Sequence, residues 1–204
     1  MDQSAPDAQA SLRAFHEAGP GNCRERTAIN SFSLVAYLPD PLGEFIGQLR
    51  RELVPDCVAR AHVTLLPPRA LQCAAPPVLG HIRRALESFQ PFHVEFGDVR
   101  FFPDTNVVYL SITQGQPQFE ELHTVLNSGT AGCTEAHPYH PHLTLAQQID
   151  PGAMAAAGEL VSRRWQEFRY SRGFLLVAVT FVQNTSDNVW IDLAAIPLGI
   201  PVAA

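Results

Sequence analysis

Two four-residue motifs in this chain share one order of side chains: imidazole, apolar, hydroxyl and apolar. They are His62-Val63-Thr64-Leu65 and His142-Leu143-Thr144-Leu145, which begin 80 positions apart. Alternate side chains of an extended strand share a face, so each motif predicts a strand with its His and Thr on one face and two apolar residues on the other. Imidazole exchanges protons near neutral pH, and a hydroxyl donates hydrogen bonds. The repeat therefore predicts two acid–base groups, each beside a hydrogen-bond donor.

Such a set of groups suits displacement at phosphorus. One imidazole can take a proton from an attacking water while the other protonates the departing oxygen. The two Thr hydroxyls can donate to the nonbridging oxygens, which gain charge during in-line attack, without requiring a metal. The candidate catalytic residues are accordingly His62, Thr64, His142 and Thr144.

The elements around the motifs follow a similar order in both halves. Each half predicts a strand, a helix and then the strand that carries the motif, so a pseudo-twofold packing would bring two similar polar faces together. Pro67 and Pro68 are expected to stop the first motif strand. The expected strands are 29–38, 62–66, 92–102, 107–112, 142–145, 174–182 and 189–193, and the expected helices lie near 42–53, 78–89, 119–126 and after Pro151.

Composition narrows the class of protein. The chain has 204 residues, 46% of them hydrophobic, which suffices for one domain or two closely packed lobes. Its 14 basic residues are all Arg, which excludes a lysine Schiff base or a P-loop lysine, and a net charge of −6 argues against an extended nucleic-acid surface. The four Cys are far apart, as in a reduced protein.

No signal peptide or membrane span is indicated, so a cytoplasmic monomer without membrane contact is expected. We expect residues 1–26 to form a loosely ordered extension, 27–198 a single bilobal domain, and 199–204 a C-terminal tail.

Both motifs and their flanks resemble the 2H phosphoesterase superfamily, especially its 2′-5′ RNA ligase and RNA 2′,3′-cyclic phosphodiesterase branch. The matching segments are Ala-His62-Val-Thr64-Leu-Leu-Pro-Pro and Tyr-His-Pro-His142-Leu-Thr144-Leu-Ala. The resemblance implies an α+β fold: a bilobal, pseudo-twofold, duplicated structure with two mainly antiparallel sheets, flanking helices and a central cleft.

The same resemblance implies a metal-independent cyclic phosphodiesterase with no cofactor. Its substrate would be the 2′,3′-cyclic phosphate of an RNA end or a small cyclic nucleotide, hydrolysed to a 2′-phosphate. His62 would be the acid and His142 the base. Some relatives also join 2′-5′ linkages.

Departures from the family pattern affect the expected substrate contacts. Family members that process RNA ends often have Arg where this chain has Gln147, and an amide cannot offset phosphate charge. Arg69 could supply that charge from the first lobe, and Tyr139 could stack on a nucleobase, although surface packing explains Tyr139 equally well. Gln147, Arg69 and Tyr139 are thus the candidate substrate-binding residues.

Two other functions stay open. Because Gln147 is neutral, a noncatalytic nucleotide or RNA-end binding module is an alternative function. The cluster of His137, His140 and His142 permits a zinc hydrolase. Solvated helix faces are the simpler interpretation of Arg50-Arg51 and Arg163-Arg164. Core packing is the simpler interpretation of Tyr109, Trp165, Trp190 and the Phe101-Phe102 pair.

Overall fold

The computed structural model describes residues 27–102 and 104–199. The predicted N-terminal extension, 1–26, and all but the first residue of the predicted tail lie outside them. No helix in the described residues is long and apolar enough to cross a membrane. Two short 3-10 turns, Gly129–Ala131 and Pro151–Ala153, accompany the main elements. These are β1 (Ala28–Tyr37), α1 (Leu42–Leu53), β2 (His62–Arg69), α2 (Ala75–Leu86), β3 (Phe92–Phe102), β4 (Val107–Gln114), α3 (Gln116–Leu126), β5 (His142–Ala146), α4 (Met154–Glu167), β6 (Gly173–Leu176), β7 (Ala178–Thr185) and β8 (Trp190–Pro197).

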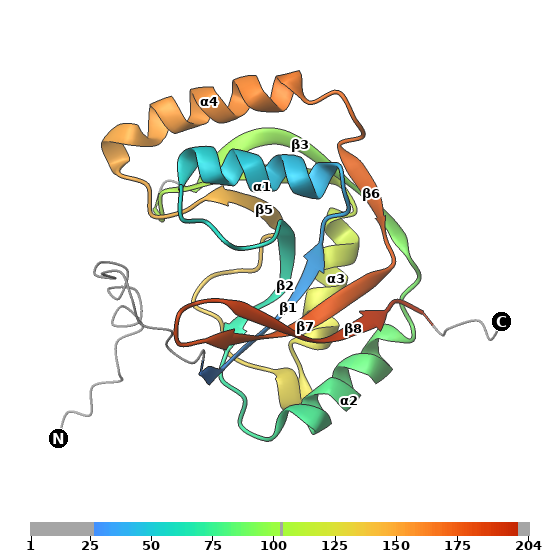
Figure 1. The fold of residues 1–204 in the computed structure, drawn as a ribbon. Coiled ribbons are helices and arrows are strands. Elements are labelled where there is room, and N and C mark those ends of the chain that lie inside the picture. The colour runs from blue at the N-terminus through green and yellow to red at the C-terminus, as the bar shows by residue number, and fades with distance from the viewer. Residues whose placement is uncertain (1–26, 103, 200–204) are drawn as a thin grey trace.

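The strands form two four-stranded sheets in which every neighbouring pair is antiparallel (Figure 1). The strand order is β2-β1-β7-β8 in the first sheet and β5-β4-β3-β6 in the second. In each sheet the strand that carries the motif lies at the edge. It pairs with the strand that precedes it in the chain, β2 with β1 and β5 with β4. The predicted α+β fold with two antiparallel sheets and flanking helices is confirmed.

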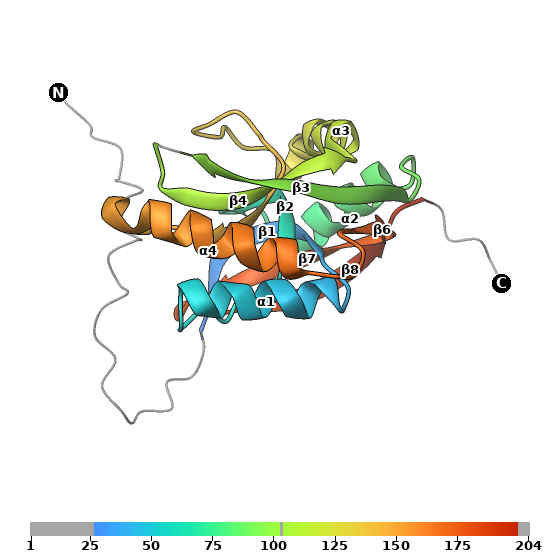
Figure 2. The same cartoon turned by 90° about the horizontal axis from the view of Figure 1, so that it is seen from above.

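One continuous hydrophobic core joins both sheets and the helices. The helices follow from their apolar spacing: Leu42, Ile46 and Leu49 recur every three or four residues and are buried along one side of α1. Helices α1 and α4 lie side by side (Figure 2), and the ring centroids of Phe45 and Trp165 are 6.1 Å apart. The motif strands thus rest on a shared core.

The C-terminal strands differ from the prediction. A single strand was expected over 174–182, but the chain leaves one sheet after Leu176 and enters the other at Ala178. Strand β6 pairs with β3, whereas β7 pairs with β1 and β8. A run of β-prone residues shows that the backbone is extended, but it does not specify which strand will be its neighbour. The last strand also continues to Pro197, beyond the predicted end.

The two prolines after the first motif do not stop its strand. Strand β2 continues through Pro67 and Pro68 to Arg69, which pairs with Phe32. The register shifts between Phe32 and Leu34, and the Ser33 hydroxyl donates to the Leu66 carbonyl over 2.6 Å. Proline is tolerated in an edge strand because its missing N–H can face away from the neighbouring strand. The position of β2 at the sheet edge therefore explains the error.

Candidate active site

The two motif strands are edge strands of different sheets, and β2 and β5 are in direct contact. The burial pattern is the same in both: the His and Thr side chains are half-buried and the intervening apolar residues are fully buried. His62 is opposite Tyr37 in the first sheet, and His142 is opposite Ser111 in the second. The alternation read from the sequence is thus present in both strands.

Each motif histidine is held by the same hydrogen bond. Nδ1 of His62 lies 2.7 Å from the Arg60 carbonyl oxygen, and Nδ1 of His142 lies 2.7 Å from the His140 carbonyl oxygen. A carbonyl can only accept, so Nδ1 carries the proton in both rings. This fixes the tautomer and leaves Nε2 of each ring to exchange a proton.

Burial favours the neutral form of both imidazoles. The pKa of His62 is lowered from 6.5 to about 4, first by burial, then by the nearby positive charge of Arg50 and, more weakly, by His142. The pKa of His142 is also lowered, mainly by burial and further by His140. In both cases the carbonyl hydrogen bond opposes the shift. Near pH 7 the unliganded site therefore holds two neutral imidazoles.

Arg50 joins the two motif strands from helix α1. Its side chain is buried, and its Nε donates to the Thr144 carbonyl over 2.8 Å, a bond that Nη2 reinforces. Nη1 donates to the Arg60 carbonyl over 3.0 Å. The prediction that Arg50 belongs to a solvated face is wrong, whereas Arg51 is exposed as predicted. A signal was present, because position 50 follows Leu49 and lies four residues after Ile46 on the apolar side of the helix.

Tyr139 forms a second link between the two halves of the chain, from a residue of the second half to the motif strand of the first. Its hydroxyl donates to the Thr64 carbonyl over 2.9 Å, and its ring stacks on that of His123, from helix α3, with centroids 3.9 Å apart. Burial and the charge of Glu135 raise the Tyr139 pKa, so this hydroxyl keeps its proton. The carbonyl of each motif Thr thus accepts a hydrogen bond from the other half of the chain. The hydroxyl and one ring face of Tyr139, a candidate base-stacking residue, are engaged within the protein.

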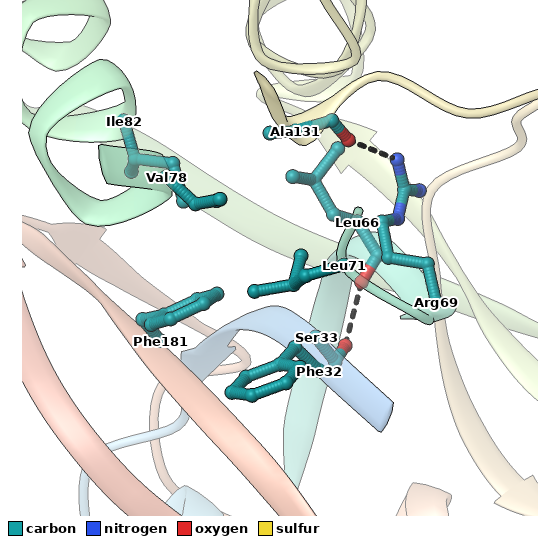
Figure 3. A pocket seen from close by; sticks show the side chains of 9 residues that line it. All are labelled: Phe32, Ser33, Leu66, Arg69, Leu71, Val78, Ile82, Ala131 and Phe181. Atoms are coloured by element: carbon teal, nitrogen blue, oxygen red, sulfur yellow. Dashed lines mark hydrogen bonds between the residues drawn. The ribbon is translucent and has the colours of Figure 1, made fainter. Parts of the chain in front are cut away.

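Arg69, predicted to contact substrate phosphate, is committed to contacts inside the protein. Its guanidinium donates to Asn127 Oδ1 over 2.7 Å and to the Ala131 carbonyl over 3.0 Å, and it forms a buried ion pair with Glu135. Figure 3 shows the bond to Ala131 beside the apolar side chains of Leu66 and Leu71. These internal contacts oppose the predicted role, because a buried guanidinium engaged by protein acceptors is not free to offset the charge of a ligand phosphate. Arg69 attaches the end of β2 to the segment after α3.

The other candidates lie near the second motif. Gln147 follows directly after β5 and is exposed. His137 and His140 are also exposed, and the ring centroids of His140 and His142 are 6.3 Å apart. Within the described ranges no three His, Cys, Asp or Glu side chains are grouped so that they could hold one metal ion. The zinc alternative thus finds no ligand set in this part of the chain.

Aromatic rings surround His142. Phe102 stacks on Tyr109 with centroids 4.1 Å apart, and both rings meet the His142 ring edge to face at about 5 Å. Tyr109 is buried, as the core-packing interpretation predicts, whereas Phe102 is only half-buried. The rings restrict the orientation of the imidazole and contribute to its desolvation.

Comparison with known proteins relates the chain to one family. The family model of the 2′-5′ RNA ligase superfamily matches residues 38–188. A protein of Oceanobacillus iheyensis, whose name assigns it provisionally to the phosphoesterases, is 34% identical over 70 residues; the match spans 34% of this chain and 41% of that protein.

Among solved structures, Escherichia coli LigT complexed with phosphate superposes with a TM-score of 0.61 at 16% identity, over 85% of this chain and 100% of that one. LigT complexed with 3′-AMP gives 0.56 at 18% identity, over 84% and 100%. At these identities the structures show a shared fold.

Proposed function

Because this chain belongs to the 2′-5′ RNA ligase superfamily, a phosphoesterase family, we propose that it is a metal-independent phosphodiesterase that opens 2′,3′-cyclic phosphates. The proposed substrate is the cyclic phosphate end of an RNA or a small cyclic nucleotide, and the product is a 2′-phosphate. Solved LigT complexes contain phosphate and 3′-AMP, which are ligands of this chemical class. Joining of 2′-5′ linkages by the same site is the second activity that we propose.

One observation carries the proposal: two half-buried imidazoles on adjacent edge strands, each with Nδ1 bonded to a backbone carbonyl. This arrangement leaves one proton-exchanging nitrogen on each ring. Its matched repetition on two strands is what an in-line displacement needs, because the nucleophile and leaving group occupy opposite sides of phosphorus. A single structural histidine would not require a second in the same setting.

In the proposed reaction His142 takes a proton from water as the water oxygen bonds to phosphorus. The bond from phosphorus to the ribose O3′ breaks, and His62 gives its proton to that oxygen. The hydroxyls of Thr64 and Thr144 donate to the two nonbridging oxygens. General acid and base steps of this kind each contribute roughly 10²- to 10⁴-fold.

The acid must be charged when substrate is bound, although His62 is neutral in the free site. A cyclic phosphodiester carries a negative charge, and an anion beside an imidazole raises the pKa of that imidazole. Substrate binding would therefore favour uptake from solvent, at Nε2 of His62, of the proton that catalysis uses. The optimum of kcat/KM, which reports the free enzyme, should accordingly lie at lower pH than the optimum of kcat.

A noncatalytic nucleotide or RNA-end binding module is the second candidate. The lowered pKa of both imidazoles favours it, because two neutral rings can accept hydrogen bonds from a ligand without transferring protons. The exposed neutral Gln147 agrees with a site that carries little fixed charge. This candidate predicts binding of a cyclic nucleotide and no product.

A turnover experiment separates the two candidates. The four nucleoside 2′,3′-cyclic phosphates and a cyclic-phosphate-ended oligonucleotide are incubated with the protein, with and without a chelator, and the products are identified. We expect 2′-phosphates in both conditions and no product from the double variant His62→Ala, His142→Ala. Product formation by the double variant would refute the mechanism, and sensitivity to chelator would refute its independence of metal.

A further inference from the structure

A recess of about 340 Å³ opens beside His62. Tyr37 lines it from β1, Arg60 from the segment just before β2 and His62 from the start of β2, while Trp190 and Asp192 line it from β8. Small-molecule sites commonly have volumes from about 300 Å³ upwards. The recess therefore has room for a group attached to a phosphate that lies between the two motif histidines.

The polar wall of this recess is held in place before any ligand binds. The Tyr37 hydroxyl donates to Asp192 Oδ1 over 2.7 Å, and Arg60 Nη1 donates to Asp192 Oδ2 over 3.1 Å. The Arg60 guanidinium also lies over the Tyr37 ring, 3.7 Å from its centroid. Burial raises the Tyr37 pKa, so its hydroxyl stays a donor. These bonds fix the directions in which the charged groups can meet a ligand.

The same groups keep unused hydrogen-bonding capacity. The Arg60 and Asp192 side chains are 63% and 46% exposed. A guanidinium has five N–H donors and a carboxylate has about four lone-pair sites, of which the bonds above use only some. The wall thus presents a donor next to an acceptor to whatever enters the recess.

Trp190 adds a flat apolar surface. Its side chain is half-buried at the recess, and within the described ranges the indole has no ring contact and no hydrogen-bond partner. Nucleobases stack on aromatic rings and guanidinium planes and are recognised through the hydrogen bonds of their edges. An indole together with an adjacent guanidinium and carboxylate matches both needs.

We propose that this recess is the nucleobase site: Trp190 stacks on the base, and the Arg60–Asp192 pair hydrogen-bonds to its edge. Asp192 accepts from an exocyclic amino group, and Arg60 donates to a neighbouring carbonyl oxygen. Guanine and cytosine carry both groups, whereas uracil lacks the amino group and adenine the carbonyl. The site therefore prefers guanine and cytosine.

This inference rests on the proposed phosphodiesterase function and indicates which histidine faces the leaving oxygen and which faces the attacking water. The base and its ribose lie on the His62 side of the phosphate. In a 2′,3′-cyclic phosphate the leaving oxygen belongs to that same ribose, so His62 faces it and donates the proton. Water then enters from the side of His142. The position of the recess thus agrees with His62 as the acid.

The first test compares substrates with and without a base. In Trp190→Leu, kcat/KM for guanosine and cytidine 2′,3′-cyclic phosphates should fall about 5- to 150-fold, the equivalent of 1–3 kcal/mol for one stacked base. Hydrolysis of glycerol 1,2-cyclic phosphate, which has no base, should not change. The exposed Tyr170→Leu variant, remote from the recess, is the aromatic control. An equal loss on both substrates, or none on either, would overturn the proposal.

The second test changes base preference. Asp192→Asn replaces a pure acceptor by an amide that can also donate, so the ratio of guanosine to uridine activity should fall at least fivefold. Glu87→Gln, an exposed carboxylate at the end of α2, is the charge control and should leave the ratio unchanged. An unchanged ratio in Asp192→Asn would contradict edge recognition at this site.

Binding measurements separate failure of this inference from failure of the proposed function. Guanosine 2′-monophosphate and glycerol 2-phosphate are titrated by calorimetry into the wild-type protein and Trp190→Leu. Only the nucleotide should bind less tightly to the variant, whether or not any cyclic phosphate is hydrolysed. No turnover together with this loss would refute the phosphodiesterase function alone, whereas identical nucleotide affinity in both proteins would refute the nucleobase site.

Discussion

Replacing Arg50 by methionine removes the contact that joins the two motif strands from helix α1. Methionine retains a long apolar side chain but loses three hydrogen bonds of 3.0 Å or less, two to the Thr144 carbonyl and one to the Arg60 carbonyl. Bonds from a charged donor contribute about 1.5–3 kcal/mol each, so the gross loss is roughly 4–9 kcal/mol.

The substitution also removes a burial cost. Burial lowers the Arg50 pKa from its ordinary value to about 10, which corresponds to a penalty of about 3 kcal/mol for keeping the charged form in the folded protein. The net loss of unfolding free energy is therefore about 1–6 kcal/mol, with a central value near 3. Arg51→Met, on the exposed side of the same helix turn, should change it by less than about 0.5 kcal/mol.

Urea unfolding followed by circular dichroism measures this difference, with an unchanged m-value as the check that the unfolded state is the same. An NMR titration supplies a second readout. Because the Arg50 charge lowers the His62 pKa, that pKa should rise from about 4 towards 6.5 in Arg50→Met and stay unchanged in Arg51→Met. Equal stability of the two variants, or a His62 pKa insensitive to Arg50, would refute this account of the site.

Acid sensitivity should depend on His62: its folded-state pKa of about 4 lies below the unfolded value of 6.5, so stability is complete above pH 6.5 and falls as the pH drops towards 4. His62→Gln should remove at most about 3 kcal/mol of that fall in urea titrations at several pH values, and identical pH profiles would contradict the shift. Arg69→Met should cost about 3–5 kcal/mol of unfolding free energy, because Glu135 loses its buried partner, while KM stays unchanged; a raised KM would restore a substrate role to Arg69. Tyr139→Phe should cost about 1 kcal/mol through the lost bond to the Thr64 carbonyl, and a neutral result would show that this bond is not a stabilising link. Thr64→Val should lower kcat by roughly 10²- to 10³-fold with little change in stability, and wild-type kcat would exclude its hydroxyl from the reaction.

Local sequence patterns predicted most of the fold. The strand alternation around His62 and His142 and the apolar spacing of α1 depend on residues a few positions apart, so they can be read from the sequence. The burial of Arg50 could be read only in part, because its helical position places it beside the apolar side of α1 but its acceptor at Thr144 lies 94 residues away. Whether an arginine on a helix is solvated or buried depends on what packs over that helix.

The same reason explains why the internal partners of Arg69 and the pairing of the C-terminal strands were not predicted. From the sequence, Arg69 is a cation just after two prolines, whereas its partners Asn127, Ala131 and Glu135 come from a distant segment. The exchange of sheets between Leu176 and Ala178 likewise depends on which strand edges are available when that segment is placed. Trp190 and Asp192 were not identified as site residues because the recess forms only when the folded sheet places β8 near β1, with β7 between them.

The passage of the chain from one sheet to the other at Val177 also affects how the molecule moves and unfolds. A single residue separates β6 in one sheet from β7 in the other, and the pairing of β1 with β7 and of β3 with β6 joins early and late parts of the chain. One hydrophobic core joins both sheets, so neither sheet can open without exposing core residues of the other, and amide protons of both should exchange with a single opening free energy. Because the two sheets share this core and β2 contacts β5 directly, we expect the folded chain to fix the spacing of the two imidazoles without a closing motion.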